Sequence, residues 1–173
     1  MDRDLPFNIP ERTQYTDDGY AVLGRALAVA TEYEGNCRAL AALLGLKAEP
    51  RLLDDEKMLG EFAEFAWRRM LKQNIDVLKS KLKLKEEFVS KLSIGRKARN
   101  YVAHETAIGA HRILESDNGR KYLAEELSIK VRELAEANLI ILVISQSITN
   151  EPVPTVEYLE AYPEQVVQWV CAH

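Results

Sequence analysis

The stretch that decides the fold is RKYLAEELSIKVRELAEANLIILVISQSIT, residues 120–149. Its apolar residues recur at steps of three and four, which is the period of one face of an α-helix. Glu151-Pro-Val-Pro154 follows directly, and proline does not continue a helix. The pattern predicts one long helix from about Arg120 to Thr149. Its inner face is expected to consist of Leu123, Leu127, Val131, Leu134, Ile141, Ile144 and Ile148.

The same period recurs upstream of this stretch. It predicts a helix from about Gly19 to Gly45, a second that starts at Asp54 or Asp55, and a third from about Lys85 to Ala110. A short last helix is expected from Pro163 to Ala172, because proline fits the first turn of a helix. Short connections between long helices imply antiparallel neighbours. The predicted fold is therefore all-α, an antiparallel four-helix bundle with an N-terminal arm and a short C-terminal helix.

The chain of 173 residues is expected to form a single domain. Residues 1–16 contain two prolines and no helical period, so we expect an extended arm there. Residues 17–150 are the expected bundle core, and residues 151–173 the expected Pro-containing linker and terminal helix. No signal peptide is recognised, two cysteines make no disulfide framework, and the longest apolar run is too short to cross a bilayer. We therefore expect a reduced, cytoplasmic protein with no membrane partner.

Basic residues are concentrated in one part of an acidic chain. The formal net charge is −4, yet residues 68–99 carry eleven basic residues and only three acidic ones. Such a belt indicates an anionic partner at one place, or else a pair of solvated helix faces. The belt consists of Arg68, Arg69, Lys72, Lys79, Lys81, Lys83, Lys85, Lys91, Arg96, Lys97 and Arg99.

The belt leads into the segment IGRKARNYVAHE, residues 94–105. On an α-helix, Arg96, Asn100 and His104 form one column, and His111 continues it two turns further. Arg99 lies about 140° round an ideal helix from His104. We therefore expect Arg99 and His104 to flank a groove that a second copy of the helix would help to close. His111 is a candidate to support the site from behind.

The residue types of this segment suit phosphodiester chemistry. Histidine transfers protons near neutral pH, and arginine binds phosphate through two parallel hydrogen bonds. Asparagine can orient either group without adding charge. RNA carries its own nucleophile, the 2′-hydroxyl, so its cleavage by internal attack requires no metal.

Arg99-Asn100-Tyr-Val-Ala-His104 resembles the signature of the HEPN superfamily, the helical-bundle ribonucleases of toxin, CRISPR and antiviral systems. The resemblance implies a homodimer whose two motifs meet at the interface, and metal-independent cleavage of RNA that leaves a cyclic phosphate. It implies that Arg99 and His104 are catalytic and that Asn100 supports them. Toxins encoded with a nucleotidyltransferase often carry tyrosine two residues after the histidine. Thr106 stands there, which disfavours that particular partner.

The expected function is a metal-independent endoribonuclease of a prokaryotic toxin–antitoxin or antiviral defence system, without a cofactor. Arg96 and Lys97 would hold flanking phosphates. Such an enzyme needs an inhibitory partner, such as an antitoxin, or a trigger. Two alternatives remain open from the sequence: a non-catalytic HEPN-like module for dimerisation or binding, and a regulator whose basic belt binds a nucleotide.

Two further patterns bear on these alternatives. The carboxylates lie off the histidine column and lack the Glu-x-x-His pairing of di-iron bundles, so no metal site is expected. The large aromatic residues sit at helical spacings. We interpret them as core rather than as a platform for stacking bases; they are Phe62, Phe65, Trp67, Phe88 and Trp169.

Overall fold

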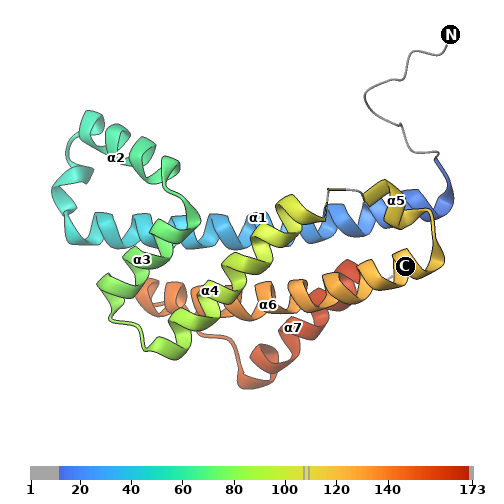
Figure 1. Cartoon of the computed structure of the whole chain (residues 1–173). Coiled ribbons are helices and arrows are strands. Elements are labelled where there is room, and N and C mark those ends of the chain that lie inside the picture. The colour runs from blue at the N-terminus through green and yellow to red at the C-terminus, as the bar shows by residue number, and fades with distance from the viewer. Residues whose placement is uncertain (1–11, 107, 109, 172–173) are drawn as a thin grey trace, which may run out of the picture.

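The computed structural model describes residues 12–106, 108 and 110–171, with only the backbone for His111. Within these residues the chain is predominantly helical and contains no strand, so the predicted all-α class is confirmed (Figure 1). The elements are α1 (Gln14–Ala48), η1 (Pro50–Leu53), α2 (Glu56–Arg68), α3 (Leu71–Leu82), α4 (Glu86–Asn100), the π-helix η2 (Tyr101–Glu105), α5 (Ala110–Leu114), α6 (Asp117–Thr149) and α7 (Val156–Cys171).

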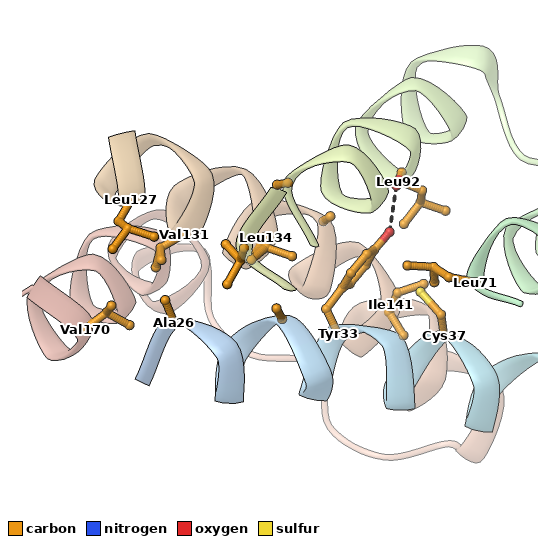
Figure 2. Packing of buried hydrophobic residues seen from close by; sticks show 14 of the residues in the cluster. Ala26, Tyr33, Cys37, Leu71, Leu92, Leu127, Val131, Leu134, Ile141 and Val170 are labelled. Atoms are coloured by element: carbon orange, nitrogen blue, oxygen red, sulfur yellow. Dashed lines mark hydrogen bonds between the residues drawn. The ribbon is translucent and has the colours of Figure 1, made fainter. Parts of the chain in front are cut away.

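The two longest helices, α1 and α6, pack along each other, and α4 crosses both (Figure 1). Helix α7 packs against α6 and also touches α1, and α3 packs against α1. One apolar cluster fills the space between these helices because each contributes a stripe at helical spacing. The predicted inner face of residues 120–149 supplies most of the α6 side. Figure 2 shows Ala26, Tyr33 and Cys37 of α1 facing Leu127, Val131, Leu134 and Ile141 of α6, with Leu71, Leu92 and Val170 around them.

The long helices begin earlier than predicted because side chains further upstream cap them. Thr13 and Thr16 form a reciprocal capping box at the start of α1. Residues 14–16 of the predicted arm are therefore helical, and residues 1–11 lie outside the described residues. Ser116 caps α6, since its side chain accepts from the Gly119 amide at 3.1 Å.

The predicted second and last helices also differ from the structure. Arg69 and Met70 have extended backbone, so the second helix is divided into α2 and α3. Helix α7 begins at Val156, and Pro163 lies inside it rather than in its first turn. The described part of the chain thus has seven α-helices instead of four and a terminal one. None of these helices combines the length and the apolar character needed to cross a membrane.

The division between α2 and α3 turns α2 away from the bundle. Among the described elements, α2 contacts only α1 and η1 (Figure 1). Ala66 is its one buried residue, whereas Phe65 and Trp67 are 61% and 71% exposed. Trp169 is 57% and Phe88 38% exposed. Their prediction as core is therefore wrong, because the helical spacing does not say whether a neighbour covers the face.

Helix α4 approaches α1 and α6 closely at Gly95. A β-carbon at Gly95 would lie 2.5 Å from the Ala137 β-carbon and 3.0 Å from the Tyr33 ring. The absence of a side chain lets the Tyr33 hydroxyl donate to the Leu92 carbonyl at 2.7 Å (Figure 2). This contact fixes the height and rotation of α4 on α1.

Gly95→Ala should destabilise the protein by up to about 2 kcal/mol. Overpacking costs roughly 1–3 kcal/mol, and the gain of about 1 kcal/mol in helix propensity offsets part of this cost. Gly24→Ala is the matched control because no atom lies within 4 Å of its new β-carbon, and it should stabilise α1 by about 0.5–1 kcal/mol. Urea unfolding measures both changes. Equal effects of the two substitutions would contradict the close approach.

Candidate functional site

The motif lies where α4 changes from an α-helix to a π-helix. The Thr106 amide donates to the Tyr101 carbonyl at 3.1 Å, an i→i+5 bond. The Thr106 hydroxyl donates to the Val102 carbonyl at 2.6 Å, and both residues are buried, so the wide turn is anchored from below. The predicted continuous α-helix to Ala110 is therefore wrong. Single π-turns inside α-helices are often found at functional sites.

The π-turn brings Arg99 and His104 together. Residues five apart lie about one turn apart in a π-helix, so the predicted wide separation around the helix does not occur. Arg99 Nη1 lies 3.2 Å from His104 Nε2. A guanidinium only donates, so this contact forms a hydrogen bond when Nε2 accepts, which requires the tautomer that carries its proton on Nδ1. His104 itself is exposed.

Asn100 lies beside the guanidinium rather than the imidazole. Its Oδ1 accepts from Arg99 Nη1 at 3.3 Å. Of the two roles left open for Asn100, the structure thus supports the orientation of Arg99. The structure places His104 against Arg99 rather than in the predicted column of Arg96, Asn100 and His104, because the π-turn shifts His104 toward Arg99.

A carboxylate that the sequence did not single out holds the other side of Arg99. Glu34 Oε2 lies 2.5 Å from Arg99 Nη2, and Glu34 Oε1 lies 2.9 Å from Arg38 Nη2. The Glu34 and Arg99 side chains are only 17% and 25% exposed, so solvent screens this pair less than an ion pair on the open surface. The available signal was the position of Glu34 in the stripe that α1 turns toward the bundle, between Ala30 and Cys37.

The other predicted site residues lie apart from this group. Arg96 is half-buried and close enough to the Tyr33 hydroxyl to oppose the rise of its pKa. Lys97 is exposed and forms no ion pair with any described residue. The side chain of His111 lies outside the described residues. The structure therefore brings together Arg99, Asn100 and His104, with Glu34 added.

Most of the basic belt is not at the motif. Its lysine-rich turn between α3 and α4 is separated from Arg99 by the length of α4, about 20 Å at the rise of an α-helix (Figure 1). Several members pair with carboxylates, as in Lys79–Glu86 at 3.3 Å and Lys91–Glu136 at 3.6 Å. Solvated helix faces thus account for the part of the belt that is remote from the motif.

Two buried groups that can ionise, the Tyr33 hydroxyl and the Cys37 thiol, lie on α1 beside the site. Burial raises the pKa of the Cys37 thiol to about 12. Burial also raises the pKa of the Tyr33 hydroxyl, with a smaller contribution from Cys37. Both groups stay protonated at neutral pH, so neither supplies a nucleophile, and Cys37 behaves as the small apolar residue that its position indicates.

Comparisons with protein-family models, curated proteins and solved structures find no match to this chain. Among the described residues, no three His, Cys, Asp or Glu side chains are grouped so that they could hold a metal ion. The functional proposal therefore rests on the geometry of Arg99, Asn100, His104 and Glu34.

Alkaline pH should destabilise the protein partly through Cys37. The unfolded chain ionises this thiol near its ordinary pKa of 9.0, whereas the folded protein keeps it protonated up to about pH 12. The contribution of the protonated thiol to stability is therefore complete below the pKa of the unfolded chain and is lost as pH rises above it. Between about pH 8 and about pH 10.5, Cys37→Ala should lose about 2 kcal/mol less than the wild type. Urea unfolding at the two pH values measures this difference.

The matched control is Cys171→Ala, since Cys171 is only partly buried. Between the two pH values, this variant should lose nearly as much stability as the wild type does. If Cys37→Ala and the wild type lost equal stability, the thiol would not be held protonated by burial.

The neutral His104 imidazole should carry its proton on Nδ1 in the wild type. In Arg99→Ala the donor to Nε2 is missing, so the proton should move toward Nε2. Long-range ¹H–¹⁵N spectra distinguish the two tautomers, and His104→Gln assigns the signal among three histidines. Arg112→Ala, which removes another exposed arginine, is the control. An unchanged tautomer in Arg99→Ala would contradict the Arg99–His104 contact.

Proposed function

We propose that the chain is a metal-independent endoribonuclease of the HEPN type. The single observation that carries the proposal is the 3.2 Å approach of Arg99 Nη1 to His104 Nε2 on an accessible π-turn. It places a permanent positive charge beside a proton acceptor. Cleavage of RNA by its own 2′-hydroxyl requires these two groups at neighbouring positions.

The proposed reaction uses the neutral form of His104. In the free protein its Nε2 lone pair accepts from Arg99 Nη1. A phosphate that binds Nη1 takes over this donor and leaves the lone pair to accept the proton of the 2′-hydroxyl. The 2′-oxygen then bonds to phosphorus, the bond from phosphorus to the 5′-oxygen breaks, and Arg99 stabilises the charge of the phosphorane. The 5′-oxygen takes up a proton, and a 2′,3′-cyclic phosphate remains.

Two neighbours keep the Arg99 guanidinium oriented during these steps. Asn100 accepts from Nη1, and Glu34 accepts from Nη2. A phosphate that approaches Nη1 thus meets a group that is already fixed in place, which reduces the cost of ordering it. Lys97, which has no ion-pair partner among the described residues, and Arg96 on the same helix would hold flanking phosphates.

The proposed assembly is a homodimer in which two copies of the motif form one composite site. Helices α1, α3, α4 and α6 would correspond to the four-helix bundle of such domains. His104 is exposed, and Ile108 four residues later is 76% exposed, so an apolar side chain beside the motif is open to a partner. His104 of the second copy would protonate the 5′-oxygen. The proposed context is a prokaryotic toxin–antitoxin or antiviral system with an inhibitory partner.

One observation favours a non-catalytic binding module as the second candidate. Both terminal nitrogens of Arg99 are engaged by groups of the protein, Nη1 by Asn100 and His104, and Nη2 by Glu34. A purely structural arginine would be satisfied in the same way. Turnover is what distinguishes the two candidates.

Purified wild-type protein should cleave a mixed cellular RNA in EDTA and leave 2′,3′-cyclic phosphate ends. Arg99→Ala should lower the rate by about 10²–10³-fold through loss of charge stabilisation. His104→Ala should lower it by about 10²–10⁴-fold through loss of proton transfer. End-labelled RNA resolved on gels measures the rates, and light scattering on the 19.6 kDa chain measures the mass.

Arg51→Ala is the matched control, because it removes one exposed arginine from η1, outside the motif. It should cleave at the wild-type rate. An inert wild type with an intact dimer would contradict catalysis and support the binding module. Equal cleavage by the wild type and both motif variants would identify a contaminating nuclease and contradict the proposal.

A further inference from the structure

The most exposed tryptophan of the described residues lies beside the proposed site. Trp67 on α2 is 71% exposed, and the Arg38 guanidinium carbon lies 4.7 Å from the centre of its ring. Arg38 comes from α1 and is itself mostly buried, with its side chain 20% exposed. One face of the indole is therefore backed by a cation, and most of the rest of the ring is open to water.

The arginine behind the ring is held in place from its far side. Arg38 Nη2 binds Glu34 Oε1 at 2.9 Å, and the second oxygen of the same carboxylate binds Arg99 at 2.5 Å. Trp67 and the proposed catalytic group are thus joined by a continuous series of contacts through Arg38 and Glu34. With ordinary bond lengths, this path puts the centre of the ring at most about 14 Å from Arg99 Nη2 and about 16 Å from Nη1, where the phosphate would bind. A single strand covers that distance in a few nucleotides.

The chemistry around Trp67 suits a base better than an apolar protein surface. An exposed indole offers a flat π-face, and an arginine behind it strengthens the stack. A second pair of the same kind lies nearby, since the Arg69 guanidinium is 4.6 Å from the exposed Phe65 ring. Arg68 at this end of α2 is already paired with Glu64, so it adds little net charge for a polyanion.

We propose that Trp67, supported by Arg38, is a stacking subsite for an unpaired base of the strand whose phosphate binds at Arg99. This inference rests on the proposed function for the identity of the strand. It assigns substrate specificity to the site: single-stranded RNA with at least one unpaired base a few nucleotides from the bond that is cut. Double-stranded RNA cannot present such a base without unpairing it.

The test uses the full chain and a single-stranded oligodeoxyadenylate of about eight nucleotides, which lacks the 2′-hydroxyl and stays intact. In Trp169→Phe the only tryptophan left is Trp67, and its fluorescence should be quenched as the oligomer binds. Trp67→Ala should weaken binding roughly 5- to 100-fold, and Trp67→Phe should retain most of the affinity. Trp169→Ala is the matched control, since Trp169 on α7 is 57% exposed and should leave binding unchanged.

Cleavage assays separate this inference from the proposed function. If the wild type cuts RNA, Trp67→Ala should raise KM for an oligonucleotide of about eight residues and leave the cleavage of a dinucleotide unchanged. If Trp67→Ala cleaved both substrates with the KM of the wild type, the subsite would be overturned while the ribonuclease stands. Quenching and weakened binding without any cleavage would keep the subsite and overturn the ribonuclease.

Self-association is the competing explanation for an exposed aromatic surface on α2. If Trp67→Ala changed the mass of the protein in light scattering but bound the oligodeoxyadenylate as the wild type does, this surface would be a contact between copies. That result would overturn the inference. Circular dichroism melting of each variant confirms that the fold is retained.

Discussion

The contact on which the rest of the molecule depends is the close approach of α4 to α1 and α6 at Gly95. No side chain separates the helices there, so Tyr33 reaches the Leu92 carbonyl and fixes α4 against α1. Arg99 follows Gly95 by one helical turn, and Glu34 follows Tyr33 by one residue. The packing of small and aromatic groups in the core therefore determines that a carboxylate of one helix meets an arginine of another at the surface.

The π-turn that follows has an equally local cause and a different consequence. Val102 and Thr106 are both buried and are joined by a short hydrogen bond, so the backbone widens between them while the helix stays attached to the core. In a regular α-helix, Arg99 and His104 would point in different directions. The wider turn puts them in contact. A site that depends on one irregular turn is sensitive to its anchors, and these lie below the surface rather than in the motif.

The groups of the site satisfy one another in the free protein. Arg99 donates to Glu34, Asn100 and His104, and Glu34 also receives Arg38. Partly buried charges need such partners, because an unpaired charge would lose much of its hydration without compensation. Because these groups already bind one another, a phosphate must displace one of their contacts before it binds. The affinity for a ligand is therefore the difference between two sets of interactions. This explains how one arrangement supports both a catalytic and a structural interpretation of Arg99.

The sequence by itself determined the helical class, the long inner stripe of residues 120–149 and the segment that carries the motif, because periodicity and the identity of side chains are local properties. The tertiary structure alone decided that Glu34 holds Arg99, that Arg99 rather than Arg96 meets His104, and that Trp67 faces solvent. These facts depend on which helices pack together, on a π-turn held by buried residues and on the break at Arg69 and Met70 that turns α2 outward. Each is a contact or an irregularity that a regular helical period does not contain.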